Sequence, residues 1–273
     1  MTSTPSYGVS MVAPGDSDLD IQEEQIRLLG YTTVDAGLSD AEMDRLSELF
    51  HAAAAAYKSS ATANGTDLDA LNEGDTVRLL PQSEPAFWDI VFNAPLHGLL
   101  ERLLGNYYIL NQVNGLINRA NNSEYHQAKY HRDLPYQHFT SSRPLAINAL
   151  FALDDFTLEN GATRVIPASH KREAFPPDRL VDATEQQVTV KRGTFIVLDC
   201  MVYHAGGKNT SPADRRAINH VFTIPMLRQQ LHIPSALGPD VDFTDAQKRI
   251  LGYGLEEYRS VDEWFSARMA KGT

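Results

Sequence analysis

The strongest constraint on the fold is a series of short apolar runs that begins near Tyr107 and is broken by turn-forming residues. Each run has the length of a β-strand, and pairs such as Asn160-Gly161 and Arg192-Gly193 punctuate the series. Many short strands at this spacing are typical of a β-sandwich or a β-barrel. The runs are YYILNQVNGLI, AKYHRDL, LAINALFAL, TRVIP, QQVTV, TFIVLD and INHVFTIP.

Helical patterns flank this β-rich region. Ser39 and Glu42 have the spacing of a capping box, and apolar residues at helical spacing follow them. A second helical pattern covers 86–104 and is expected to break or kink at Pro95. A third pattern covers 242–271.

No linker composition separates these parts, so we expect a single domain over 1–273. The first residues, 1–20, are rich in Ser, Pro, Gly and Asp and are expected to be loose. The β-core is expected over 107–235, which makes the fold class mostly β with flanking helices.

Charge and cysteine content narrow the possible partners. The net charge of −11 disfavours binding to phosphate backbones, so we expect no nucleic-acid partner. Cys200 is the one cysteine, which excludes an internal disulfide and a thiolate zinc cluster. The chain has neither a visible secretory signal nor an apolar run of about 20 residues, the length that a membrane span needs. We therefore expect a cytoplasmic protein that does not enter the membrane.

The most informative short motif is His131-Arg132-Asp133. In an extended strand, residues two apart point to the same side, so an imidazole and a carboxylate would share one space. Such a pair supplies two thirds of the 2-His-1-carboxylate triad that binds Fe(II) and leaves coordination positions open. A His-x-Asp sequence is common by chance, and most instances are surface or turn residues.

His204 is the candidate third ligand, because it follows the apolar run TFIVLD and precedes the run AGGKNTS. Taken alone, it would more often be a buried structural histidine. Arg215 opens the next apolar run, and its guanidinium can bind a carboxylate through two parallel hydrogen bonds. The alternative for Arg215 is a surface arginine that follows a turn.

The segment from about Tyr130 to Pro225 resembles the phytanoyl-CoA dioxygenase family of Fe(II)/2-oxoglutarate oxygenases. The matching pieces occur in the order of the family. They are YHRDLPY, LAINALFALDDFTLENGATRVIPASHK, KRGTFIVLDCMVYHAGGKNTS and RRAINHVFTIP. One departure is Ala168, where such families usually have a glycine.

The resemblance implies a double-stranded β-helix, or jelly-roll, core of the cupin type. It implies that His131, Asp133 and His204 bind iron, and that Arg215 binds the C5 carboxylate of 2-oxoglutarate. The implied reaction consumes O₂ and 2-oxoglutarate, releases succinate and CO₂, and oxidises a small molecule, by default through hydroxylation. Related halogenases lack the carboxylate ligand, so the presence of Asp133 disfavours halogenation.

Further pocket residues are suggested by position in the predicted strands. Gln127 is expected to contact 2-oxoglutarate, as are Asn148 and Thr194, which are polar residues in apolar runs. Lys129 and Phe139 are the candidates for substrate contact. An inward lysine is costly without a partner, so Lys129 either binds an anion or a bulge turns it outward. For Asn148 the alternative is a solvent-facing side chain, and for Phe139 it is simple core packing.

The main alternative function is a non-oxidative β-barrel metal protein, namely an isomerase, a hydrolase or a ligand-binding module that holds Zn or Mn. Arg215 argues against it, because a hydrolase needs no anchor for a dicarboxylate.

The sequence does not identify the substrate, the oligomeric state or the pathway. Natural-product biosynthesis is an interpretation from the breadth of the family. Desaturation, epoxidation and ring closure remain open beside hydroxylation.

Overall fold

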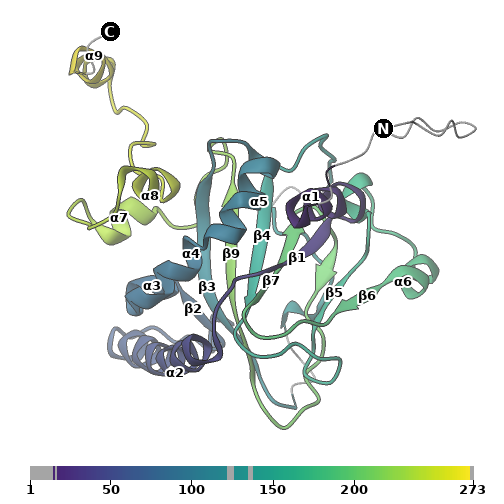
Figure 1. The fold of residues 1–273 in the computed structure, drawn as a ribbon. Coiled ribbons are helices and arrows are strands. Elements are labelled where there is room, and N and C mark those ends of the chain that lie inside the picture. The colour runs from purple at the N-terminus through teal and green to yellow at the C-terminus, as the bar shows by residue number, and fades with distance from the viewer. Residues whose placement is uncertain (1–14, 16, 122–125, 135–137, 271–273) are drawn as a thin grey trace, which may run out of the picture.

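The strands of this chain form two antiparallel sheets, with α2 to α5 on one side and α6 on the other (Figure 1). The computed structural model describes residue 15 and residues 17–121, 126–134 and 138–270. The six-stranded sheet has the order β1-β7-β4-β9-β3-β2, and the three-stranded sheet has the order β6-β5-β8. The strands are β1 (Tyr31–Asp35), β2 (Thr76–Arg78), β3 (Ile109–Asn118), β4 (Ala146–Ala152), β5 (Thr163–Val165), β6 (Gln186–Val188), β7 (Thr194–Asp199), β8 (His204–Ala205) and β9 (Arg215–Thr223).

The helices precede, interrupt and follow the sheets. They are α1 (Asp18–Leu29), α2 (Asp40–Ala63), α3 (Leu80–Ser83), α4 (Trp88–Val91), α5 (Ala94–Leu104), α6 (Asp178–Thr184), α7 (Ile233–Leu237), α8 (Asp245–Ile250) and α9 (Val261–Ala270), with the 3₁₀ turns η1 (Pro85–Phe87), η2 (His126–Ala128) and η3 (Ser169–Lys171). Within the described ranges, none of these helices combines the length and the apolar character that crossing a membrane requires.

The two faces of the larger sheet bury different cores, because successive side chains of a strand point to opposite sides. On β7, Phe195 and Val197 join the large core that also contains buried residues of α2, α4 and α5. Ile196 and Leu198 join a second core with Val165 of β5 from the smaller sheet. The space between the two sheets is therefore closed off from the helical side.

The expected fold class, mostly β with flanking helices around a jelly-roll core, agrees with this arrangement. The capping box at Ser39 is present, with the Glu42 carboxylate accepting from the Ser39 backbone N–H at 2.7 Å. The helical pattern over 86–104 is divided as expected, but the break precedes Asn93, which caps α5 with its side chain. A single domain over 1–273 stays a prediction.

Three local expectations were wrong. The end of the supposedly loose segment opens α1, where Ser17 and Asp20 form a further capping box; residues 1–14 and 16 lie outside the described residues. The helical first third also contains β1 and β2, which add strands to the edges of the larger sheet. The run AKYHRDL contributes an isolated bridge at His131 instead of a strand.

Ala168 adopts a left-handed backbone conformation, with φ 60° and ψ 7°. Its N–H donates to the carbonyl of Leu29 at 2.7 Å, which ties the turn before η3 to the end of α1. A residue with a Cβ pays about 1 kcal/mol or more in this region. The departure from glycine noted in the sequence therefore falls at a position where glycine fits better.

We expect Ala168→Gly to raise the free energy of unfolding by about 0.5–1 kcal/mol, because relief of strain exceeds the added freedom of the unfolded chain. Ala146→Gly, in the buried part of β4, should lower it, since no positive φ is relieved there. Chemical denaturation measures both variants. A loss of stability in Ala168→Gly as large as in Ala146→Gly would contradict this reading.

Candidate metal centre

His131 and His204 are brought together by a short backbone bridge. The N–H of His131 donates to the His204 carbonyl at 3.0 Å, and the N–H of His204 donates to the His131 carbonyl at 3.1 Å. His204 begins β8, which pairs with β5 of the smaller sheet. Asp133 is held by its N–H, which donates to the carbonyl of Cys200 at 3.1 Å.

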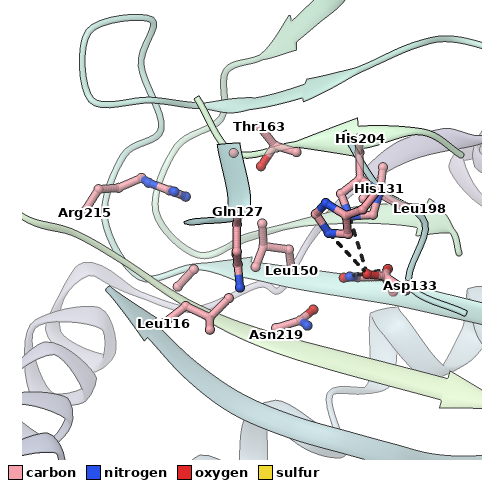
Figure 2. A pocket seen from close by; sticks show the side chains of 13 residues that line it. Leu116, Gln127, His131, Asp133, Leu150, Thr163, Leu198, His204, Arg215 and Asn219 are labelled. Atoms are coloured by element: carbon pink, nitrogen blue, oxygen red, sulfur yellow. Dashed lines mark hydrogen bonds and ion pairs between the residues drawn. The ribbon is translucent and has the colours of Figure 1, made fainter. Parts of the chain in front are cut away.

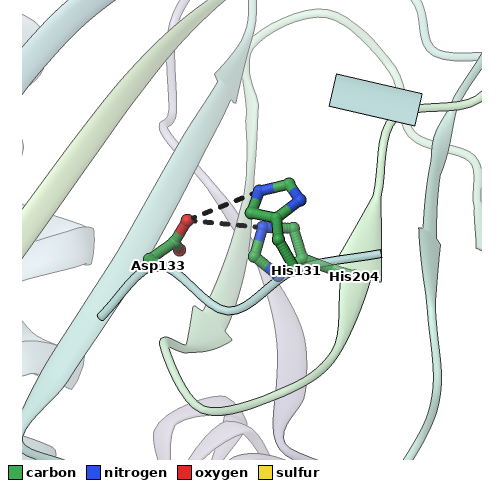
Figure 3. A group of neighbouring side chains, drawn as sticks. All are labelled: His131, Asp133 and His204. Carbon is green, nitrogen blue, oxygen red and sulfur yellow. Dashed lines mark ion pairs between the residues drawn. The ribbon is translucent and has the colours of Figure 1, made fainter. Parts of the chain in front are cut away.

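The three candidate ligands converge on one point (Figure 3). Oδ1 of Asp133 lies 3.5 Å from Nε2 of His204 and 3.8 Å from Nε2 of His131. One donor atom from each residue lies within 4.8 Å of the others. Bonds of about 2.1 Å to an octahedral ion place neighbouring donors about 3 Å apart. A small inward movement of the side chains would therefore close this set around an ion.

Each candidate ligand has one polar atom in a hydrogen bond to the protein and a second polar atom directed toward the other two ligands. Nδ1 of His131 lies 2.9 Å from the carbonyl of Lys129, and Nδ1 of His204 lies 3.0 Å from that of Val202. A nitrogen that faces a carbonyl must carry the proton in the neutral ring, so Nε2 of each ring is the nitrogen whose lone pair can bind a metal. Nδ2 of Asn148 donates to Oδ2 of Asp133 at 2.8 Å, which leaves Oδ1 for the ion.

Electrostatics keep the carboxylate ionised. Burial alone would raise the pKa of Asp133, but His204, His131 and the hydrogen bond from Asn148 outweigh burial and lower the pKa to about 2. Burial would likewise lower the pKa of His204, whereas the Asp133 carboxylate beside it raises it. Two nitrogen donors and one anionic oxygen, with no other protein donor in the described part of the cluster, fit a ferrous ion with open positions.

Arg215 lies in the same pocket as the triad, across from it in the view of Figure 2. It opens β9 opposite Asn118 and is 4% exposed. Its guanidinium stacks 4.1 Å above the ring of Phe156, which fixes the direction of the cation. A dicarboxylate with one end at the triad would meet this cation at its other end.

The pocket between the sheets has a volume of about 550 Å³, which includes space open to solvent. Its lining combines apolar side chains with a few polar ones. The lining residues are Leu116, Gln127, His131, Asp133, Asn148, Leu150, Thr163, Leu198, His204, Gly206, Arg215, Ala217 and Asn219.

Two further expected residues line this pocket. Gln127 lies in η2, where its carbonyl accepts from the N–H of Gly206 at 2.8 Å. Asn148 faces the pocket from β4, where one N–H of its side-chain amide donates to Asp133. This bond makes Asn148 a support for Asp133, and its contact with 2-oxoglutarate stays a prediction.

The structure places the other expected residues outside this pocket. Thr194 shares the strand face of Leu198, but it lies four residues away, roughly 13 Å along β7. The Lys129 side chain is exposed, and its backbone carbonyl orients His131 instead. Phe139 packs against an apolar cluster that includes Leu134.

Several lining residues were missed by the sequence reading. Leu150 is two positions from Asn148, and Ala217 and Asn219 are two and four positions from Arg215, so strand parity would have found them. Thr163 comes from β5 in the other sheet. No local signal places it, because only the pairing of β5 with β8 brings it beside the ligands.

We expect Asn148→Leu to weaken binding of Fe(II) by about 10–100-fold, because the Asp133 carboxylate loses the donor that orients it. Anaerobic titration of the metal-free protein with Fe(II) or Co(II) measures the change. The same substitution at Asn111, which donates to the carbonyl of Arg228 away from the pocket, is the matched control. Equal affinities in the two variants would remove Asn148 from the support of the site.

A second prediction concerns Asp199, which lies at the end of β7. Burial raises its pKa to about 6, against the hydrogen bond from the N–H of Met201, which lowers it. The folded state then keeps the Asp199 proton up to about pH 6, whereas the unfolded state releases it near pH 4. The contribution of Asp199 to the free energy of unfolding is therefore complete below pH 4 and is lost as the pH rises through 6.

Asp199→Asn removes this dependence. We expect the unfolding free energy of the variant minus that of the native chain to increase by about 3 kcal/mol from pH 4 to pH 7, since two pKa units correspond to that amount. Denaturation curves across this range measure the difference. A constant difference over the whole range would show that Asp199 does not titrate as described.

Comparisons with known proteins agree with this geometry. Residues 26–217 match the family described as phytanoyl-CoA dioxygenase (PhyH). An uncharacterized protein of Mycobacterium tuberculosis is 27% identical over 260 residues, which cover 92% of each chain. The iron/alpha-ketoglutarate-dependent dioxygenase ausO of Aspergillus calidoustus is 30% identical over 162 residues, which cover 55% of this chain and 54% of ausO.

Among solved structures, EctD from S. alaskensis, crystallised with 2-oxoglutarate and 5-hydroxyectoine, superposes with a TM-score of 0.64 at 20% identity, covering 81% of this chain and 80% of EctD. This likeness confirms the expected jelly-roll fold. The family match confirms the resemblance seen in the motifs and the expected reaction class. The chain belongs to the phytanoyl-CoA dioxygenase family and is an iron- and 2-oxoglutarate-dependent dioxygenase.

Proposed function

We propose that this protein hydroxylates a C–H bond of a small organic molecule at the centre formed by His131, Asp133 and His204. The reaction consumes O₂ and 2-oxoglutarate and releases succinate and CO₂. The observation that carries the proposal is that three ligand atoms and the Arg215 guanidinium share one pocket. A bound ferrous ion supplies the O₂ activation that no side chain in this pocket can provide.

Arg215 orients the cosubstrate. Its fork accommodates a carboxylate through two parallel hydrogen bonds, and stacking on Phe156 limits the rotation of the guanidinium. Thr163 and Gln127 line the space between Arg215 and the triad. With Asn219, they are polar side chains that can hold the dicarboxylate along its length.

Apolar side chains exclude water from the same space. Leu116 and Leu150, with Leu198 and Ala217, line the pocket between the sheets. Their low polarity strengthens the attraction between Arg215 and a carboxylate. They also protect an oxidising centre from side reactions with solvent.

The finer points of the function are predictions. A role in natural-product biosynthesis follows from the breadth of the family, and hydroxylation is favoured over desaturation, epoxidation or ring closure as its default outcome. The cytoplasmic location and the absence of a nucleic-acid partner also remain predictions. The non-oxidative alternative that holds Zn or Mn is disfavoured by the family match and by the shared pocket of Arg215 and the triad.

The test begins with the metal-free protein under anaerobic conditions. Addition of Fe(II) and 2-oxoglutarate should give a weak visible charge-transfer band, whereas Zn(II) should give none. Asp133→Ala should abolish the band and the release of succinate on exposure to O₂. Full turnover in that variant would refute the ligand assignment, and a zinc-dependent reaction without O₂ would favour the alternative.

Arg215→Ala should raise the KM for 2-oxoglutarate by about 10–100-fold, because a charged hydrogen-bond partner of roughly 1.5–3 kcal/mol is lost. Affinity for Fe(II) should change little, since Arg215 lies across the pocket from the triad. Arg192→Ala is the control, because Arg192 pairs with Asp40 and Asp44 outside the pocket. An unchanged KM in Arg215→Ala would remove this residue from the cosubstrate site.

A further inference from the structure

A second cluster of side chains lies behind the candidate ligands. His131 and Asp133 face the pocket, whereas Arg132 between them is 2% exposed and contacts the segment 169–173. Tyr203, which directly precedes His204, is 4% exposed and contacts the same segment. Each ligand segment thus directs its ligands into the pocket and a large buried side chain, Arg132 or Tyr203, toward the segment 169–173.

Arg132 joins the two ligand segments directly. Its guanidinium carbon lies 4.0 Å from the centre of the Tyr203 ring, which is the distance of a cation–π contact. The first ligand segment is therefore stacked on the residue next to the third ligand.

Arg132 also satisfies the backbone at the end of η3. Nη2 donates to the carbonyl of Ser169 at 3.0 Å and to that of Arg172, and Nη1 donates to the carbonyl of Glu173 at 3.2 Å. The carbonyls of Arg172 and Glu173 follow the last residue of η3, and a cation at the end of a helical turn is favourable. One side chain thus ties the first ligand segment to three carbonyls of the 169–173 loop.

Tyr203 is tied to the same loop at two points, and to Ile166 just before the loop. Its N–H donates to Oγ of Ser169 at 2.8 Å, its hydroxyl donates to the carbonyl of Glu173 at 3.1 Å, and its carbonyl accepts from the N–H of Ile166 at 2.9 Å. Arg132 and Tyr203 therefore share Ser169 and Glu173 as partners. The loop, the ring and the guanidinium form one closed set of contacts.

The ligand segments themselves are joined by few regular strand bonds. Among the described residues, the His131–His204 bridge is isolated, and β8 is two residues long. A bridge of this length gives less resistance to sliding or twisting than a continuous ladder does. The support behind the ligands is then the natural source of their fixed spacing.

We propose that Arg132 is a positioning residue that holds the His131–Asp133 segment at a fixed spacing from His204, so that the metal site is formed before the ion binds. This inference rests on the ligand assignment of the proposed function. Arg132 acts through Tyr203 and the 169–173 loop and not through the ion. Lysine does not replace it, because an ammonium offers neither the planar fork nor the stacking face.

The experiment compares Arg132→Met and Arg132→Lys with Arg164→Met. Arg164 is a stringent control, because its guanidinium also stacks on a tyrosine, Tyr130 at 5.1 Å, and also donates to a backbone carbonyl, that of Ala128. Its guanidinium contacts residues that directly precede His131 and also pairs with Glu185 at 3.3 Å, and its substitution leaves the link between Arg132 and Tyr203 in place.

Two readouts do not depend on turnover. Titration of the metal-free protein with Co(II) should show affinity lowered about 10–100-fold in both Arg132 variants and changed by less than about threefold in Arg164→Met. Hydrogen exchange at the amides of His131 and His204 in the metal-free protein should accelerate in the Arg132 variants and not in Arg164→Met. If Arg132 had a purely structural role, the Arg132 and Arg164 variants would both unfold at a lower temperature, and their Co(II) affinities and amide exchange rates would not differ in this way.

Equal loss of Co(II) affinity at the two arginines, or unchanged affinity in Arg132→Met, would overturn the proposal. If Arg132→Met does not fold, Tyr203→Leu and Tyr203→Phe replace it, because the first removes the ring and the second only the hydroxyl. Co(II) affinity should then fall in Tyr203→Leu and be kept in Tyr203→Phe, and equal affinities would also overturn it. His131→Ala reports on the ligand assignment separately, since native Co(II) affinity in that variant refutes the metal site itself.

Discussion

The two backbone hydrogen bonds between His131 and His204 are the interaction on which the candidate site depends. They join segments that are far apart in the sequence and place two imidazoles side by side, with ring centres 4.4 Å apart. Asp133 then needs one more backbone bond, to Cys200, to complete the triad. The sheets around this bridge act mainly as a frame that brings the two segments to the same place.

Charge balance gives a reason for the presence of the Arg215 cation in the same pocket as the ligands. Two neutral imidazoles and the Asp133 carboxylate would leave a ferrous ion with one positive charge. A dianionic cosubstrate bound at Arg215 would, together with this cation, contribute one negative charge, so the filled pocket would be neutral overall. Neutrality matters because uncompensated charge between two apolar sheets is expensive. Arg215 is then as much a part of the electrostatics of the site as the ligands are.

Much of the site was predictable from the sequence because its residues lie in short motifs. His131, Asp133 and His204 stand in runs with a recognisable order, and Asn148 stood out as a polar residue in an apolar run. Thr163 was beyond such reasoning, since its place depends on the pairing of two sheets and not on neighbours in the chain. Thr194 shows the reverse problem, because strand parity gives the face of a residue but not how far along the strand the pocket extends.

The fold shows the same division. The strands of the core were foreseen from their apolar runs, whereas β1 and β2 were hidden in a region dominated by helical patterns. Edge strands of this kind are stabilised by the sheet that they join: β1 adds to β7, and β2 adds to β3. The run of β1, YTTVD, carries β-forming residues with alternating burial, so its strand was within reach of the sequence and was missed. The three residues of β2, TVR, are too few to give a pattern.

The three ligands are unequally shielded, and this affects how an ion is exchanged. The side chains of Asp133 and His204 are 10% and 8% exposed, whereas that of His131 is 35% exposed. An incoming ion, or a chelator that removes one, would therefore reach the imidazole of His131 before the other two ligands. Exchange of the metal at such a site would begin at His131.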